Sequence, residues 1–288
     1  MGMMIASVFG RRGLGRLVLA GLVCGCSRSP GPPRRLPGGG GAWGELVVYA
    51  AEAPTRRGFI AMPAGTAPFP AIVLNHGSER YPGANPAATS FFTDHGYVTL
   101  VPHRRGQGRS DGRYILDEVN EAFFLRRGVV LTEKLVEQVD DVAAAVSYLR
   151  SKRFVDPDRI AVVGCSFGGI EALLAAERDV PIRGVIDFAG GAMTWGRFGN
   201  WTFRDRLRQA ARNARVPIFF IQAENDYDTE PSRQLAAEMV KASRPHRLKI
   251  FPPNGSSPEE GHAFCAGGPS PPWGADVLAF LDETMPKR

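Results

Sequence analysis

Residues 159–176 read RIAVVGCSFGGIEALLAA, and they indicate the fold most clearly. After Arg159, residues 160–163 are apolar and mostly β-branched, as in a buried strand, whereas residues 170–176 have the composition of a helix. A Gly-x-Ser-x-Gly pentapeptide that leaves a strand and enters a helix is typical of a nucleophile elbow. Such a turn leaves no room for side chains at Gly164 and Gly168 and holds Ser166 in a strained, exposed position. Ser166 is therefore the candidate nucleophile.

The rest of the folded part alternates apolar strands with helical stretches. Further strands are expected over residues 45–50, 58–62, 71–75, 97–101, 183–187, 217–221 and 247–251, and helices near residues 86–95, 133–150 and 275–285. This alternation predicts an α/β fold, with a mostly parallel twisted sheet and helices on both faces. Functional residues of such sheets lie at the carboxyl ends of the strands.

The net charge of +6 does not indicate a nucleic-acid partner. Six arginines precede residue 45, so the rest of the chain holds 35 − 6 = 29 basic side chains against 29 acidic ones. The overall neutrality of this domain gives no support for electrostatic attraction to a polyanion. We therefore expect no nucleic-acid partner.

Residues 1–26 resemble a lipoprotein-type signal peptide. Arg11, Arg12 and Arg16 precede the apolar residues 17–23, a run far shorter than the roughly 20 residues that span a bilayer. Cys26 is the expected lipidation site because the small Gly25 precedes it, whereas Val23 precedes Cys24. A lipid anchor at Cys26 would attach the exported protein to the membrane of the cell envelope. The alternatives are a plain secretory signal and an uncleaved anchor.

A tether and a domain are expected to follow this signal. Residues 27–44 are rich in proline and glycine and have no apolar periodicity, which predicts a flexible tether. Residues 45–288 then form one domain. It contains only two cysteines, Cys165 and Cys265, so a disulfide framework is not expected, although a single bridge between the two is possible.

A serine nucleophile needs a histidine base and an acid that orients the histidine. Two histidines follow Ser166 in the chain. His246 precedes a predicted strand and so lies at the wrong edge of the sheet, whereas His262 lies on a loop after that strand. His262 is therefore the candidate base. Asp226 is the candidate acid because it follows the strand at 217–221.

Two further acids, Glu224 and Asp228, lie close to Asp226 and remain alternatives. Acids in this position also commonly cap the helix that follows. The oxyanion formed on attack needs two hydrogen-bond donors. The backbone N–H of Phe167 is one, and the N–H of Ser78, in the loop after residues 71–75, is the other candidate, with Glu79 second.

Several residues are candidates for substrate binding. We assign Trp195, Trp201 and Tyr227 to this role. Trp195 and Trp201 belong to a stretch dense in aromatic residues, which could cover an apolar pocket or, equally, pack a helix onto the sheet. Residues 111–131 could act as a lid over an apolar pocket. The cluster of Arg104, Arg105 and Arg109 could bind a substrate carboxylate, but a solvated or salt-bridged loop is the favoured interpretation.

These motifs resemble those of the α/β-hydrolase superfamily, and specifically of its dienelactone-hydrolase-like branch. The shared segments are 76–77 (HG), 105–110 (RGQGRS), 156–160 (DPDRI), 164–169 (GCSFGG), 224–226 (END) and 261–264 (GHAF). The resemblance covers residues 45–288 and implies the roles assigned above to Ser166, Asp226 and His262. Dienelactone hydrolases proper use a cysteine nucleophile, however, so Ser166 favours generic ester hydrolysis.

The sequence thus predicts a serine hydrolase that acts on a small-molecule ester without a metal or organic cofactor, since no cluster has metal-ligand spacing. Aminopeptidase-like or acyltransferase activity with the same triad is one alternative. A non-catalytic envelope binding protein on a hydrolase scaffold is another, because a fold does not determine function.

Overall fold

The structure, a computed structural model, describes residues 44–197 and 200–287. The proposed signal peptide, Cys26 and nearly all of the tether lie outside these residues. No helix in the described ranges has the length and apolar character needed to cross a bilayer.

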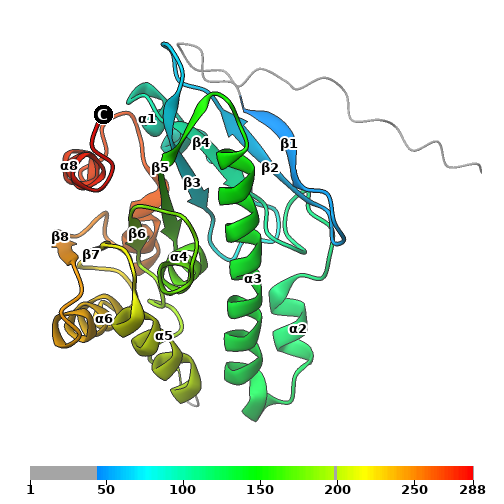
Figure 1. Cartoon of the computed structure of the whole chain (residues 1–288). Helices are drawn as coiled ribbons and strands as arrows, with labels where there is room; N and C mark the ends of the chain where they lie inside the picture. The colour runs from blue at the N-terminus through cyan, green and yellow to red at the C-terminus, as the bar shows by residue number, and fades with distance from the viewer. Residues whose placement is uncertain (1–43, 198–199, 288) are drawn as a thin grey trace, which may run out of the picture. The chain divides into compact units, whose positions relative to one another are not determined.

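One eight-stranded sheet forms the centre of the molecule, with the strand order β1-β2-β4-β3-β5-β6-β7-β8 (Figure 1). The strands are β1 (Glu45–Ala50), β2 (Arg56–Ala61), β3 (Phe69–Asn75), β4 (Val98–Pro102), β5 (Val155–Cys165), β6 (Val185–Phe188), β7 (Ile218–Ala223) and β8 (His246–Phe251). Strand β2 pairs antiparallel with β1 and β4, and all other pairs are parallel. This is the mostly parallel sheet that the sequence predicts.

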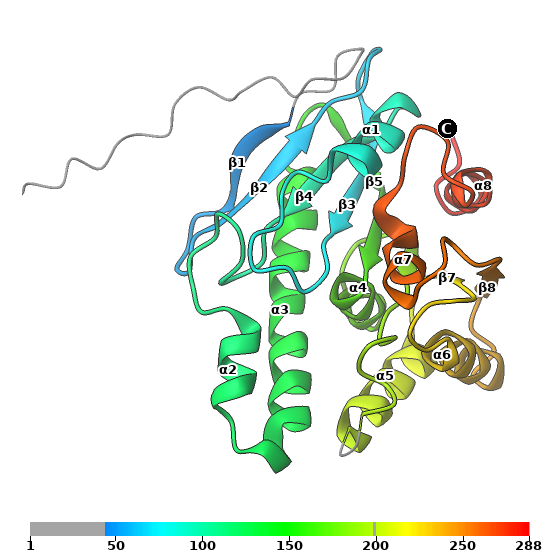
Figure 2. The ribbon, with the colours of Figure 1, turned by 180° about the vertical axis from the view of Figure 1, so that it is seen from behind.

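Helices cover both faces of the sheet (Figures 1 and 2). One face carries α2 (Ile115–Glu121), α3 (Arg127–Arg150), α4 (Phe167–Glu177), α5 (Trp201–Asn213) and α6 (Glu230–Lys241). The other face carries α1 (Pro86–Asp94) and α8 (Gly274–Thr284). Short elements complete the chain: η1 (Phe124–Arg126), α7 (Pro258–His262) and η2 (Ala263–Ala266).

Alternation along the strands explains the two layers. In β3, Ala71 and Val73 belong to the core under α3 and α4, whereas Ile72 and Leu74 belong to the core under α1 and α8. A strand buried on both faces must be apolar at every position, which is why these strands read as continuous apolar runs. Because the central strands β3, β5 and β6 are parallel, their carboxyl ends lie at one edge of the sheet, where the candidate residues gather.

Candidate active site

Ser166 lies in a very tight turn between β5 and α4. Its backbone has φ 56° and ψ −117°, an unusual conformation for a residue with a side chain. A Cβ atom at Gly164 would lie 2.0 Å from the carbonyl oxygen of Gly168, and one at Gly168 would lie 2.1 Å from that of Asn75. Only glycine fits at either position. The turn therefore has the geometry that the pentapeptide predicts.

Asp226 and His262 meet at the same edge of the sheet. Asp226 follows β7, and its Oδ1 lies 2.9 Å from Nδ1 of His262, the last residue of α7. The carboxylate also accepts hydrogen bonds from the Tyr227 N–H (2.7 Å) and from Gln222 Nε2 (2.8 Å). These contacts orient the Asp226 carboxylate, and the carboxylate in turn orients the imidazole of His262.

The other candidate acids and the other histidine lie elsewhere. Asp228 Oδ1 accepts from the Glu230 N–H (2.9 Å) at the start of α6, which is the capping role considered above. Glu224 is exposed. His246 begins β8 and therefore lies at the opposite edge of the sheet. Of the three neighbouring acids, Asp226 alone is found in contact with His262 among the described residues.

Ser166 and His262 line one cavity but are not hydrogen-bonded to each other in the described part of the chain. His262 Nε2 is buried and has no hydrogen-bond partner among the described residues, so this nitrogen is available to a proton. Hydrogen bonds of this kind are often long or misaligned without substrate and tighten when substrate binds.

The segment that carries His262 is attached at two further points. A Cβ at Gly261 would lie 2.7 Å from the backbone of Asn225 and Asp226, so glycine lets α7 approach β7 closely. A disulfide joins Cys165, directly before Ser166, to Cys265, three residues after His262. The sequence did not determine whether these two cysteines are bridged, and in the structure they are.

The loop after β3 lies against Ser166. A Cβ at Gly77 would be 3.4 Å from Cβ of Ser166. The Gly77 carbonyl accepts a hydrogen bond from Arg104 Nη2 (2.6 Å), and the His76 carbonyl accepts one from Nη1 (2.7 Å). Since C=O and N–H point in opposite directions in a trans peptide, Arg104 directs the Ser78 N–H away from itself. Phe167 is the first residue of α4, where N–H groups lack helical partners.

Arg104 is fully buried and forms an ion pair with Glu171, so the salt-bridged interpretation holds for this arginine and the solvated one does not. Besides the two carbonyls it contacts Asn75 Oδ1 (2.8 Å) and, through Nε, Glu171 of α4 (2.8 Å). Burial raises the pKa of Glu171 to about 7, and the charge of Arg104 opposes that rise. Arg104 thus connects the loop before Ser78 to the helix after Ser166.

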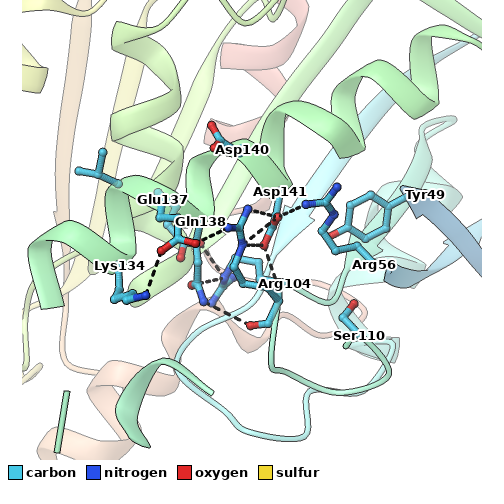
Figure 3. A network of polar contacts seen from close by, with 12 residues as sticks. Tyr49, Arg56, Arg104, Ser110, Lys134, Glu137, Gln138, Asp140 and Asp141 are labelled. Atoms are coloured by element: carbon cyan, nitrogen blue, oxygen red, sulfur yellow. Dashed lines mark hydrogen bonds and ion pairs between the residues drawn. The ribbon is translucent and has the colours of Figure 1, made fainter. Parts of the chain in front are cut away.

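Arg105 and Arg56 both bind the buried carboxylate of Asp141 in α3. Figure 3 shows the contact between Arg56 and Asp141. Arg105 Nη2 and Arg56 Nη1 lie 2.8 Å and 3.0 Å from Asp141 Oδ1. The hydrogen bond from Arg105 to Asp141 raises the pKa of the guanidinium. The guanidinium groups of Arg104 and Arg105 are thus used within the protein, and the salt-bridged interpretation holds for Arg105.

The model of the Dienelactone hydrolase family matches residues 57–277 of this chain. The chain belongs to the dienelactone hydrolase family. This family member is also similar to the quorum-quenching protein AidA of Acinetobacter baumannii (strain MDR-ZJ06). The two are 32% identical over 121 residues, which cover 41% of this chain and 34% of AidA. The match therefore spans about a third of the length of that relative.

Solved structures share the fold of this family member. Dipeptidyl peptidase 4 of Porphyromonas gingivalis superposes with a TM-score of 0.61 at 15% identity, over 84% of this chain and 36% of that chain. Est1E from Butyrivibrio proteoclasticus, solved with ferulic acid, superposes with a TM-score of 0.61 at 18% identity, over 84% of this chain and 100% of that chain. The α/β-hydrolase fold predicted from the sequence is confirmed.

The three aromatic residues assigned to substrate binding have different positions in this dienelactone hydrolase family member. Trp201 lines a cavity beside Ser166. Tyr227 packs edge-on against His262, with ring centroids 5.6 Å apart, and its hydroxyl donates to Glu259 (2.9 Å). Trp195 is 3% exposed and packs in the core against Phe203, so its assignment to substrate contact is wrong. The sequence does not indicate whether an apolar side chain on a predicted loop points into the core or toward the site.

Arg104, Asn75 and Glu171 act together at the elbow, a role that was not predicted from the sequence. Asn75 Nδ2 donates to Glu171 (2.9 Å) and to the Gly168 carbonyl (3.2 Å), so all three surround the elbow. Polar residues at the ends of neighbouring buried strands were the available signal, since Asn75 ends β3 and Arg104 comes shortly after β4. No cluster of three or more potential metal ligands occurs in the described ranges.

Proposed function

We propose that this hydrolase is a serine carboxylic-ester hydrolase that uses Ser166, His262 and Asp226 as its triad. The observation that carries the proposal is the Asp226–His262 contact of 2.9 Å beside a serine in a strained elbow. A binding protein on the same scaffold has no need for a strained serine, an oriented imidazole and a buried carboxylate in one place.

In this mechanism His262 Nε2 takes the proton from Ser166 as Oγ bonds to the ester carbonyl carbon. The C=O π electrons move to the oxygen, and the N–H groups of Phe167 and Ser78 stabilise that oxyanion. Collapse of the intermediate breaks the ester C–O bond, and His262 returns its proton to the departing alcohol. Water then repeats the sequence on the acyl-enzyme and releases the acid.

Labelling with a fluorophosphonate tests the triad in the full-length protein. We expect stoichiometric labelling of the parent, loss of labelling in Ser166→Ala and His262→Ala, and a fall in ester hydrolysis of roughly 10⁴-fold or more in Ser166→Ala. Asp226→Asn should lower hydrolysis strongly, whereas the matched variant Asp228→Asn should change it little. A folded Ser166→Ala protein that keeps its esterase activity contradicts the assignment.

We also propose that the protein is exported and carries a lipid anchor at Cys26. Support comes from the Cys165–Cys265 disulfide, because disulfides persist in oxidising compartments outside the cytosol. Metabolic labelling with a radioactive fatty acid in a bacterial host should label the parent and Cys24→Ser but not Cys26→Ser. Equal labelling of both variants contradicts the assignment to Cys26.

A further inference from the structure

Two cavities meet at Ser166, and Ser78 and Met193 also line both of them. The larger has a volume of about 700 Å³ and extends toward α2, α3 and α5. The smaller has a volume of about 470 Å³ and extends along the loop that follows β3 to α7. A substrate whose carbonyl carbon lies at Ser166 can therefore place one group in each cavity.

The larger cavity has an exposed apolar wall. Phe124, Leu125, Met193 and Trp201 line it and are 65%, 64%, 41% and 52% exposed. Apolar side chains this exposed and this close together are typical of a ligand-binding groove. An apolar chain lying along them would remove their surface, and its own, from water. Arg127 and Arg197 also line the cavity, and each donates to a backbone carbonyl of its own segment.

His262 lines the smaller cavity and is absent from the lining of the larger one as described. The general acid must reach the oxygen of the departing alcohol when the ester bond breaks. The alcohol must therefore lie on the side of His262, in the smaller cavity. The acyl chain is then directed into the larger one.

The charge of the smaller cavity is negative. Glu79 and Glu259 line it, and its described lining contains no lysine or arginine. Hydrogen bonds from backbone and from the Tyr227 hydroxyl lower the pKa of Glu259, which keeps that side chain ionised at neutral pH. Burial lowers the pKa of His76, so its imidazole adds no positive charge. An anionic alcohol would meet like charges here, whereas a neutral polar or cationic alcohol would not.

We infer that the preferred substrates are esters of a medium- or long-chain apolar acid with a neutral polar or cationic alcohol. This inference rests on the proposed function, because it assigns the two sides of the scissile bond from the roles of Ser166 and His262. The acyl chain lies against Phe124, Leu125 and Trp201, and the alcohol lies between His262 and the two carboxylates.

A series of p-nitrophenyl esters from acetate to dodecanoate tests the acyl side in the full-length protein. We expect kcat/KM to rise by up to about fourfold for each added methylene until the cavity is filled. Phe124→Ala and Trp201→Ala should lower kcat/KM for octanoate about 10-fold and for acetate less than about twofold. Val240→Ala, which shortens an exposed apolar side chain of α6, should change neither ester.

The octanoyl esters of choline and of glycolate test the alcohol side, since they share the acyl chain and differ in charge. We expect the choline ester to be favoured at low salt, and Glu79→Gln/Glu259→Gln to reduce that preference several-fold. Hydrolysis that depends on Ser166 but falls with chain length, or that favours the glycolate ester, overturns the inference and leaves the triad intact. Hydrolysis that survives Ser166→Ala overturns the proposed function itself.

Discussion

Ser166 and His262 are held in place in opposite ways. The serine lies at the end of a central strand, and backbone atoms of α4 and β3 surround its turn at distances that only glycine allows. The histidine lies on a five-residue helix near the sheet edge, attached through Asp226, Gly261 and one disulfide. The close-packed core therefore determines the position of the proposed nucleophile, and a few specific bonds determine that of the proposed base. The position of Ser166 should be hard to alter without unfolding the protein, whereas that of His262 should be easy to alter.

Gly168→Ala should have the largest effect, because the added Cβ would lie 2.1 Å from the Asn75 carbonyl oxygen and 2.6 Å from that of His76. We expect the folded state to be lost, or its free energy of unfolding to fall by more than about 4 kcal/mol. Urea unfolding followed by circular dichroism measures this. Gly268→Ala is the control on the histidine side, since its Cβ meets no atom within 4 Å. Equal stability of the two variants contradicts the comparison.

Arg104→Met should reduce both stability and catalysis. The variant removes the donors to the loop before Ser78 and leaves Glu171 buried without its cation, at a cost of about 3–5 kcal/mol. We expect kcat to fall about 100-fold, with a smaller change in KM, because the proposed oxyanion donor at Ser78 is no longer held in place.

Two companion variants separate the two roles of Arg104. Arg104→Met/Glu171→Gln should recover part of the lost stability without recovering kcat, since no charge is left unpaired but the loop is still free. Arg56→Met removes another buried cation, one that contacts Asp141 and not the loop, and should leave kcat nearly unchanged. If kcat follows stability in all three variants, Arg104 has no separate positioning role.

Loss of the disulfide should affect the histidine side selectively. Cys165→Ala/Cys265→Ala should lower the free energy of unfolding by about 2–4 kcal/mol. It should lower kcat about 10-fold or more, because His262 loses an attachment to the elbow and small displacements are costly in catalysis. A reducing agent should produce the same loss in the parent and none in the variant. Unchanged kcat in the folded variant contradicts the role given to the disulfide.

Asp187 on β6, near the elbow that carries Ser166, should make the free energy of unfolding depend on pH. Burial raises its pKa to about 7. The Gly190 N–H donates a hydrogen bond to Asp187 Oδ1 (2.9 Å) and opposes that rise. In the native state Asp187 thus keeps a proton that it releases near pH 4 in the unfolded chain. The contribution of Asp187 to the free energy of unfolding is therefore present at low pH and is lost as the pH rises through 7.

Asp187→Asn cannot ionise and should remove that loss. We expect the variant to gain stability over the parent between pH 5 and pH 8, by about 1–4 kcal/mol, as measured by urea unfolding at each pH. Glu177→Gln, which replaces an acid at the far end of α4 from the elbow, is the control. A stability difference between parent and Asp187→Asn that is constant with pH means that Asp187 does not titrate in this range.

The strands, the elbow and the three candidate residues of the triad could be predicted from the amino-acid sequence. These depend on local rules: apolar runs make buried strands, glycines permit one tight turn, and chain order places Asp226 and His262 after successive strands of a parallel sheet. Chain order left three acids open, however, and only the contact at His262 separates Asp226 from Glu224 and Asp228.

Tertiary structure alone decided the features that join distant parts of the chain. The disulfide joins cysteines 100 residues apart, Arg104 reaches both β3 and α4, and Trp195 turns into the core while Trp201 faces the cavity. No local pattern records these contacts, because the direction of a side chain on a loop depends on which elements pack against it. The two cavities at Ser166 arise for the same reason, since each is lined by segments that only the fold brings together.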